Sequence, residues 1–251
     1  MRRIRFLHAH PLFRLTLPID ALVILSLPFA FTDLDLVISS AFYNAATGVW
    51  TLGKSTPVML IYNYGTWPTW AAVYVSLVVL VLGLFFERER AWRRSLLFFV
   101  LAVVCGPGLL VNAYGKSHLD RPRPNDVFQP GDEAPFQRLG RFARGVDGAS
   151  FPSGHASMGF IWLAPAYYFR ARRLRWARRF TVLAFVHGGL LGLARVAAGG
   201  HYVSDVMWAA GADCIAAILL CIVFGLVSAA RGHEEEFAYD VLGETTPVKA
   251  G

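Results

Sequence analysis

The stretch that decides both fold and chemistry opens an apolar segment in the second half of the chain, and it reads Phe151-Pro152-Ser153-Gly154-His155-Ala156-Ser157. Serine is a favourable residue at the start of a helix, and the glycine after it lets a ligand approach the backbone. Free N–H groups at a helix start bind phosphate oxygens, and a histidine beside them can exchange a proton with the ligand. Alone, the same residues also suit a simple turn and helix cap, so the distinction between a phosphate site and a cap depends on the polar residues elsewhere in the chain.

Two further polar clusters lie where apolar segments end or begin. Lys116 is followed by Arg123 after six intervening residues, and Arg195 is followed by His201 and then Asp205. Asp205 lies four residues after His201, so in a helix the two side chains share a face. A carboxylate there can accept the imidazole N–H and make the other ring nitrogen a better nucleophile. A His–Asp pair at a helix start could equally serve only as a cap.

The composition indicates a membrane protein. Of 251 residues 55% are hydrophobic and 16% charged, and a run of about 18 apolar residues spans a bilayer core. We therefore predict an all-α fold, an integral membrane bundle of six transmembrane helices over residues 15–31, 69–86, 95–114, 153–169, 180–197 and 201–227. The first could be a signal peptide, but Pro18 and Asp20 interrupt its core and favour a retained helix. Gly106-Pro107-Gly108 should loosen the third.

The remaining segments complete a single domain over residues 1–251, with a core at about 69–228. Residues 32–68 are too broken to span and are rich in Trp and Tyr, which indicates an interfacial helix with loops. Residues 115–152 form a long polar extracytoplasmic loop, and we expect residues 229–251 to be a mobile polar tail.

Arginine-rich connections predict the orientation. The amino terminus and residues 87–94 and 170–179 alternate so as to lie on one side, which should be cytoplasmic, as should both termini. The 115–152 loop and the 198–202 corner then face outward, so all three polar clusters lie at one membrane face. The outer loop is basic against the usual bias, which indicates an anionic ligand or anionic lipid. The formal net charge of +7 does not point to nucleic acid, because the bases lie in membrane-flanking loops.

Together the clusters suit a phosphate ester. Lys116, Arg123 and Arg195 would neutralise the non-bridging oxygens, and His155 would protonate the departing alkoxide. Each cation alone could be an interfacial residue that extends its charge toward water. No carboxylate cluster suited to Mg²⁺ accompanies the motifs, so we predict no metal and no cofactor, with activity that survives a chelator.

Lys-x6-Arg-Pro, Pro-Ser-Gly-His and Arg-x5-His-x3-Asp, in this order, resemble the signature of the type 2 phosphatidic acid phosphatase (PAP2) superfamily. The resemblance implies a metal-independent phosphatase that works through a phosphohistidine. It assigns His201 as nucleophile, Asp205 as its orienting carboxylate and His155 as general acid. Phosphate would be held by Lys116, Arg123, Ser153, Gly154 and Arg195. One departure is Ala194, where the family motif usually has serine. The same residue set resembles the vanadate site of haloperoxidases, which are soluble proteins.

Within the family, residues 31–36, 41–44 and 118–124 look most like bacterial lipid A phosphatases. That resemblance implies a lipid phosphate substrate, a bacterial inner membrane location and a site that faces the periplasm. Phosphatidylglycerophosphate, phosphatidate and undecaprenyl pyrophosphate stay open as substrates. A transport protein and a catalytically inactive lipid-binding protein are the alternatives from other classes.

Two more ionisable residues lie inside predicted spans. His187 is eight residues before Arg195, and Asp213 is eight after Asp205. On antiparallel helices both should lie about 12 Å below the polar clusters, at about 1.5 Å per residue. Charges inside a membrane usually have partners, so we predict a His187–Asp213 pair.

Overall fold

A computed structural model describes residues 11–87, 92–129, 134–142, 148–170 and 173–227 of the protein. The predicted tail at 229–251 lies outside these residues. The elements, in chain order, are α2 (Pro11–Phe31), α3 (Leu34–Ser40), β1 (Tyr43–Asn44), β2 (Val49–Trp50), α4 (Thr56–Tyr64), α5 (Trp67–Phe85), α7 (Arg93–Val103), the π-helix η1 (Val104–Gly115), α8 (Lys116–His118), α9 (Pro124–Val127), α10 (Gly154–Phe160), α11 (Leu163–Phe169), α12 (Leu174–Ala197) and α13 (Val203–Val223).

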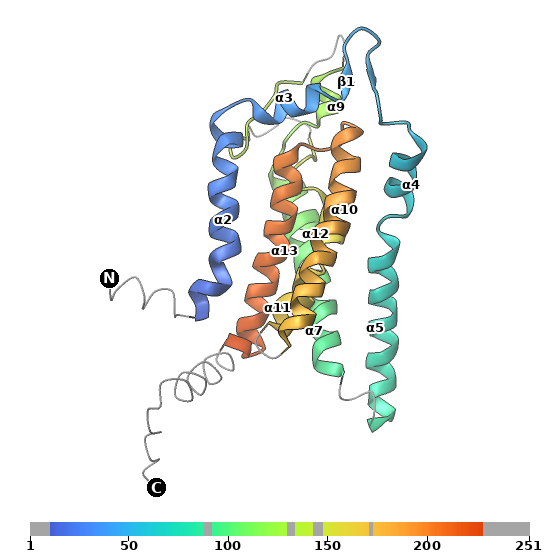
Figure 1. Ribbon diagram of the computed structural model, residues 1–251, viewed down its shortest axis with the longest axis vertical. Coiled ribbons are helices and arrows are strands. Elements are labelled where there is room, and N and C mark those ends of the chain that lie inside the picture. Colours follow the sequence, from blue (N-terminus) through green and yellow to red (C-terminus); the bar gives the residue numbers. More distant parts are fainter. Residues whose placement is uncertain (1–10, 88–91, 130–133, 143–147, 171–172, 228–251) are drawn as a thin grey trace, which may run out of the picture.

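The helices form an elongated bundle whose long members run roughly along one axis (Figure 1). Four helical stretches are long and apolar enough to cross a membrane: Thr56–Phe85, Arg93–His118, Leu174–Ala197 and Val203–Val223. A fifth is counted if α2 and α3 are taken together, although they are bent by 78° at the break between them. The predicted all-α, multi-pass membrane bundle is confirmed, but the described residues do not contain six uninterrupted spans.

The predicted fourth span is where the count differs. Residues 153–169 form two short helices, α10 and α11, which both pack against α12. Pro165 has no N–H to donate to Ile161 four residues earlier, and the Ile161 carbonyl accepts instead from Ala164 at 2.9 Å. This hydrogen bond spans three residues instead of the four of an α-helix, and the altered turn separates α10 from α11.

The second span begins earlier than predicted. α4 and α5 join into one helical stretch from Thr56 to Phe85 that is long and apolar enough to cross a membrane, so the second candidate span begins before residue 69. In the rest of residues 32–68, α3 lies across the end of the bundle (Figure 1). The two-residue strands β1 and β2 pair antiparallel beside it, a hairpin that the sequence did not predict.

The third span contains the expected irregularity. Gly106-Pro107-Gly108 falls within the π-helical turns of η1, where the Pro107 carbonyl accepts from Asn112 Nδ2 at 2.6 Å. π-Helical turns inside α-helices are rare and occur mostly near functional sites. The helix therefore continues through the proline to Lys116 with its spacing altered.

Close backbone contact joins α10 to α12. A Cβ atom built on Gly159 would lie 2.5 Å from the Gly188 Cα atom and 2.6 Å from the Gly188 nitrogen. Only glycine fits at such a distance, because real Cβ atoms do not approach backbone so closely. This contact holds the helix that carries His155 against the helix that ends near Arg195.

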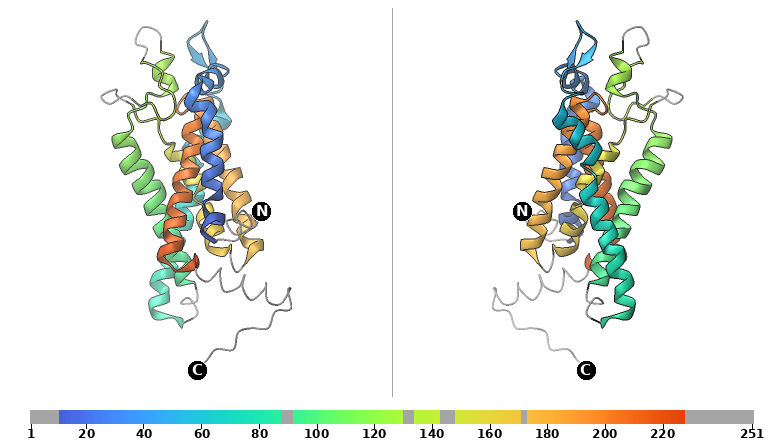
Figure 2. Two further views of the ribbon diagram at one scale, coloured as in Figure 1. Left: turned by 90° about the vertical axis from the view of Figure 1, so that its left-hand side faces the viewer. Right: turned by 90° about the vertical axis from the view of Figure 1, so that its right-hand side faces the viewer.

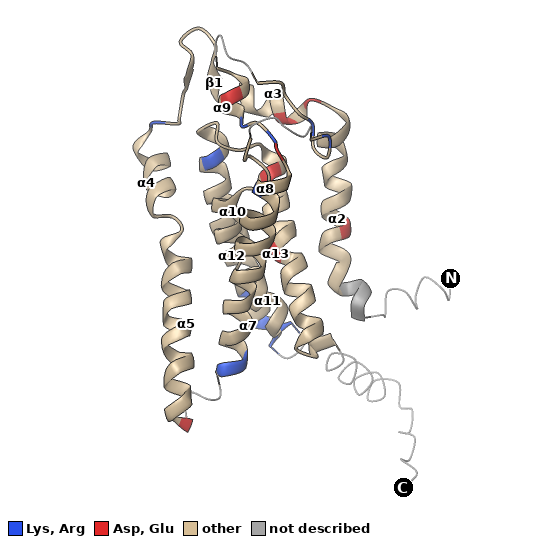
Figure 3. Cartoon of the chain, turned by 180° about the vertical axis from the view of Figure 1, so that it is seen from behind, with Lys and Arg blue, Asp and Glu red and all other residues tan. Residues whose placement is uncertain are grey.

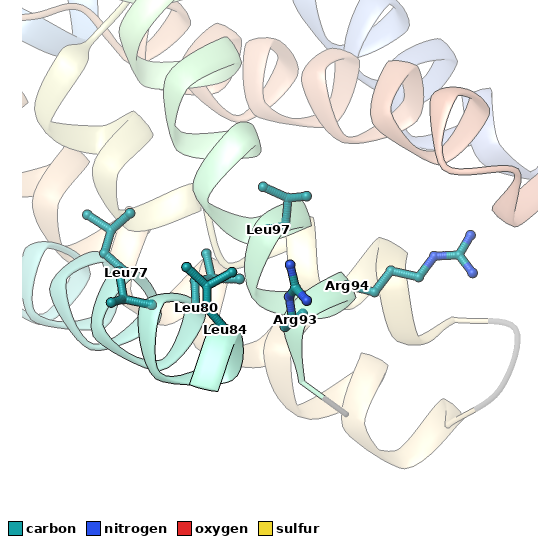
Figure 4. Close-up of a pocket in the computed structure, with 7 residues that line it drawn as sticks. Leu77, Leu80, Leu84, Arg93, Arg94 and Leu97 are labelled. Atoms are coloured by element: carbon teal, nitrogen blue, oxygen red, sulfur yellow. The ribbon is translucent and has the colours of Figure 1, made fainter. Parts of the chain in front are cut away.

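Charged residues gather at the two ends of the bundle and leave its middle largely uncharged (Figure 3). One end, which we call the site end, holds α3, the hairpin, α8, α9 and the start of α13, as the side views also show (Figure 2). The opposite end holds the end of α5 and the start of α7. A groove of about 700 Å³ lies there, lined by Leu77, Leu80, Val81, Leu84, Arg93, Arg94 and Leu97 (Figure 4).

Candidate active site

His201 occupies the short connection between α12 and α13, and only 3% of it is exposed. Its Nδ1 atom lies 2.6 Å from the Ser150 backbone oxygen. A carbonyl oxygen only accepts hydrogen bonds, so Nδ1 carries the proton and Nε2 keeps its lone pair. Burial lowers the pKa of His201, although Asp205 opposes this effect. The ring is therefore neutral at neutral pH, which is the form a nucleophile requires.

Asp205 does not accept the expected hydrogen bond from the His201 imidazole. Its Oδ2 atom lies 3.8 Å from His201 Nδ1, too far for a hydrogen bond. The carboxylate accepts instead from Ser150 Oγ at 2.5 Å, from the Tyr202 backbone N–H at 2.8 Å and from Arg121 Nη1 at 2.5 Å. The direct partner of the imidazole is thus the Ser150 carbonyl, which sequence spacing alone did not indicate.

Arg121 is the largest residue of the site that sequence analysis missed. Its side chain is fully buried and bridges Asp205 and Asp35, whose Oδ2 atom accepts from Nη2 at 2.8 Å. Its guanidinium also lies over the Tyr202 ring, 4.2 Å from the centroid. Burial opposes the charge on Arg121, but the two carboxylates outweigh it and raise the pKa of the guanidinium. The available signal was its place two residues before Arg123 in the first motif.

The predicted phosphate-binding cations come together at the site end. Lys116 begins α8, Arg123 precedes α9 and Arg195 lies in the last turn of α12. The three interact electrostatically, so their charges lie close together. Among the residues that the structure describes, none forms an ion pair with a carboxylate, and the Nε atoms of Arg123 and Arg195 are buried without a hydrogen-bond partner. Half-buried cations without carboxylate partners are suited to an anionic ligand.

Ser153 and Gly154 lie against this cation cluster. The Ser153 side chain caps α10 by accepting from the Ala156 N–H at 3.4 Å, and the Ser153 N–H donates to the Asp205 backbone oxygen at 3.1 Å. A Cβ atom on Gly154 would lie 3.3 Å from Lys116 Nζ and 3.1 Å from Asn112 Oδ1. Glycine therefore keeps space open beside the lysine ammonium.

His155 is held by a tyrosine that the sequence did not single out. Its ring stacks on Tyr62 of α4, with centroids 5.0 Å apart and planes 13° from parallel. The Arg195 guanidinium lies 4.6 Å from the centroid of the same tyrosine. His155 also interacts electrostatically with Arg195, His201 and Lys116. The predicted acid, nucleophile and cations therefore lie in one cluster, and Tyr62 of α4 packs against two of its members.

The predicted His187–Asp213 pair is wrong. His187 accepts from Trp162 Nε1 at 2.9 Å, and its Nε2 lies 2.7 Å from the Gly65 backbone oxygen. Asp213 is fully buried and accepts from Ser157 Oγ at 2.9 Å. The two residues face different helices, because His187 is turned toward the α4–α5 junction. Spacing along two helices predicts depth but not the direction of a side chain.

Carboxylates and histidines do not form a metal centre in the described part of the chain: no three His, Cys, Asp or Glu side chains are arranged to hold an ion. Ala194, at the position where the family motif usually has serine, is buried in α12 with 4% exposed.

Comparison with known proteins agrees with the geometry. Residues 92–232, more than half of the chain, match the PAP2 superfamily. The chain is 33% identical to a lipid A 4'-phosphatase of Francisella tularensis subsp. novicida over 181 residues, which are 71% of this chain and 80% of that protein. It is 37% identical to a lipid A 4'-phosphatase of Rhizobium etli over 142 residues, 55% of this chain and 52% of that protein.

A phosphatidylglycerophosphatase B of Bacillus subtilis is 30% identical over 136 residues, which are 52% of this chain and 57% of that protein. No solved structure gives a match. The order of the motifs, the helical membrane architecture and these similarities agree on an enzyme rather than a transporter. The chain therefore belongs to the PAP2 superfamily and is a phosphoric monoester hydrolase, a lipid phosphatase of the membrane.

Proposed function

We propose that the protein removes a phosphomonoester from a lipid of the lipid A type, at the periplasmic face of a bacterial inner membrane, through a phosphohistidine on His201. The observation that carries the proposal is the close approach of three cations beside two histidines: Lys116, Arg123 and Arg195 have no carboxylate partner within the part of the chain that the structure describes. Such a cluster is suited to a ligand with two or more negative charges, as a phosphomonoester has at neutral pH.

In the first step Nε2 of His201 attacks phosphorus, the new N–P bond forms and the bond from phosphorus to the lipid oxygen breaks. The three cations stabilise the charge that gathers on the non-bridging oxygens. Burial and the neighbouring cations lower the pKa of His155 to about 4, and a bound phosphate anion beside the ring favours its protonated form. In that form His155 gives its proton to the leaving lipid oxygen. Its stacking on Tyr62 supports this role, because the contact restricts the orientation of the imidazole ring.

In the second step a water molecule attacks phosphorus, and His155, now neutral, takes a proton from it. The N–P bond breaks, inorganic phosphate leaves and His201 is again neutral. The reaction needs no metal in this proposal, because lysine and arginine supply the positive charge that a metal supplies in other phosphatases.

The choice of substrate rests on the relatives. Two of those described above are named lipid A 4'-phosphatase, and one is named phosphatidylglycerophosphatase B. Lipid A is therefore the favoured substrate, and phosphatidylglycerophosphate is the main alternative. Phosphatidate and undecaprenyl pyrophosphate complete the set of lipid phosphates worth assay.

The orientation rests on charge. Arginines are numerous near the opposite end of the bundle, among them Arg93, Arg94, Arg173, Arg175, Arg178 and Arg179. Short arginine-rich connections stay in the cytoplasm. With that end inside, the site end faces the periplasm and both termini are cytoplasmic.

The test is a phosphate-release assay of the purified protein in one detergent, with lipid A, phosphatidylglycerophosphate, phosphatidate and polyprenyl pyrophosphate as substrates. His201→Ala should lower the rate on the best substrate by at least about 1,000-fold, because no other group can form the covalent intermediate. His187→Gln is the control and should stay within about threefold of wild type, since His187 bonds outside the cluster. Equal rates for wild type and His201→Ala contradict the proposal, and loss of activity in EDTA that Mg²⁺ restores contradicts its metal-independent form.

A further inference from the structure

Ser150 joins three parts of the site with three different groups. Its N–H donates to the Arg121 backbone oxygen at 3.0 Å, its hydroxyl donates to Asp205 Oδ2 at 2.5 Å and its carbonyl lies 2.6 Å from His201 Nδ1. The residue is fully buried. A buried residue with all its polar groups engaged has one defined orientation, since any rotation would leave a polar group unpaired.

Asp205 acts on the imidazole directly through its charge, but its hydrogen-bonded connection to the ring runs through this serine. The gap of 3.8 Å from Oδ2 to His201 Nδ1 excludes a direct hydrogen bond, and both carboxylate oxygens already accept from other donors. One of those donors is the Ser150 hydroxyl. The carboxylate therefore fixes the serine, and the serine carbonyl meets the ring.

The position of Asp205 is in turn held by Arg121 and, through Arg121, by Asp35 near the start of the chain. Arg121 donates to Asp205 and to Asp35 of α3, and Asp35 also accepts from the Ser204 hydroxyl at 2.5 Å and the Ser204 N–H at 3.0 Å. Asp35, Arg121 and Asp205 are all fully buried. A buried cation between two carboxylates, with the remaining positions filled by hydroxyl and backbone donors, holds a single geometry.

We propose that Ser150 is the positioning residue for His201: Asp205, held by Arg121 and Asp35, fixes Ser150 through its hydroxyl, and the Ser150 carbonyl keeps the proton on Nδ1 and leaves Nε2 free to attack. This inference rests on the proposed function. In this arrangement Asp205 orients the His201 ring indirectly, through Ser150. Asp35 of α3 supports the same ring although it lies 166 positions before His201 in the sequence.

The expected effect follows from the geometry of attack. A displacement of about 1 Å in a reacting group costs on the order of 100-fold in rate, and loss of a supporting hydrogen bond beside a reacting ligand costs about 10–100-fold. Ser150→Ala removes the hydroxyl but keeps the carbonyl, so it loosens the ring without removing its partner. We expect kcat to fall about 10–100-fold with KM within about threefold, because phosphate contacts are unchanged.

The pH profile provides the readout that a merely structural effect would not change. The charged or titratable groups near His201 are Asp205 of α13, Arg195 of α12 and His155 of α10. Without the serine hydroxyl, Asp205 Oδ2 is free to accept directly from Nδ1. A carboxylate partner favours the imidazolium, so the pKa of His201 rises and the neutral nucleophile is lost at a higher pH. The acid limb of kcat/KM should therefore move to higher pH in Ser150→Ala.

Ser157→Ala is the matched control. Ser157 is also a fully buried serine whose hydroxyl donates to a fully buried carboxylate, Asp213, at 2.9 Å. The Ser157 hydroxyl bonds to Asp213 and not to the groups that hold His201, so its variant should keep kcat within about threefold and leave the acid limb in place. Both variants are assayed as full-length protein in detergent, with gel filtration and thermal unfolding to show that they are folded.

The outcomes separate the inference from the proposed function. Ser150→Ala with wild-type kcat and an unmoved acid limb overturns the inference, and so does an equal loss in Ser157→Ala. If Ser150→Ala does not fold, Ser150→Cys decides: its thiol is a weaker donor, and an unchanged kcat and acid limb overturn the inference again. If His201→Ala retains wild-type phosphate release, the proposed function fails first, whatever the serine variants do.

Discussion

Helices α5 and α13 are both apolar enough to cross a membrane, but they differ in what surrounds them. Half of the most apolar 18-residue window of α13 is buried inside the bundle, against 17% for the stretch that contains α5. α13 carries the buried carboxylates Asp205 and Asp213, whereas α5 carries no charged residue. Hydropathy identifies both helices, but only the helix that the others enclose holds carboxylates buried in the bundle.

The same contrast separates the arginines at the two ends. Arg121 at the site end is fully buried, and carboxylates, a hydroxyl and a backbone carbonyl accept from it. Arg93 at the opposite end lines the open groove between α5 and α7 (Figure 4). A buried charge requires every partner to be in place, whereas an exposed one is largely solvated and contributes little to stability.

The largest loss of stability is expected when the buried arginine, Arg121, is replaced, and Arg93 serves as its exposed counterpart. Arg121→Met leaves Asp35 and Asp205 buried without their cation, and breaking such a buried network costs about 3–5 kcal/mol. We expect a strong loss of thermal stability in detergent together with loss of phosphatase activity. Arg93→Met at the groove should change stability by no more than about 0.5 kcal/mol. Similar melting temperatures for the two variants would contradict the difference in burial between Arg121 and Arg93.

A smaller effect is expected where α10 meets α12. Gly159→Ala places a methyl group 2.5 Å from the Gly188 Cα atom, and overpacking of this kind costs about 1–3 kcal/mol. The control is Gly189→Ala on α12, since nothing lies within 4 Å of its added Cβ atom. That variant should be as stable as wild type or slightly more stable, because alanine favours a helix. Denaturation in detergent measures both, and a Gly159→Ala variant as stable as Gly189→Ala contradicts the close contact.

The smallest effect is expected on α5. Leu84 is 56% exposed at the groove, so Leu84→Ala should change the free energy of unfolding by no more than about 0.5 kcal/mol. Leu220→Ala on α13 is the counterpart: Leu220 is 8% exposed, and its truncation should cost about 2–5 kcal/mol. Thermal unfolding of the two variants in the same detergent measures both costs. Equal costs would mean that α5 is as enclosed as α13.

Much of the fold and the site could be predicted before the structure. Long apolar runs indicated the membrane bundle, and alternation of basic connections indicated that Lys116, His155 and His201 would share one end. The broken fourth span was harder to predict, because Pro165 interrupts a pattern that is apolar throughout. The early start of the second span was missed because aromatic residues in α4 are typical both of a membrane interface and of a helix that lines a site.

The family, the apolar helices and the groups that would carry the chemistry could all be identified from the sequence, because they depend on residue type and on spacing over short distances. The hydrogen-bond partners of these groups became clear from the three-dimensional arrangement of the helices. Asp35 meets Ser204 across 169 residues, His187 turns to Gly65 instead of Asp213, and the Ser150 carbonyl takes the place expected for Asp205. Hydrogen bonds require both distance and direction, and for residues far apart in the chain these follow from how the helices pack against one another.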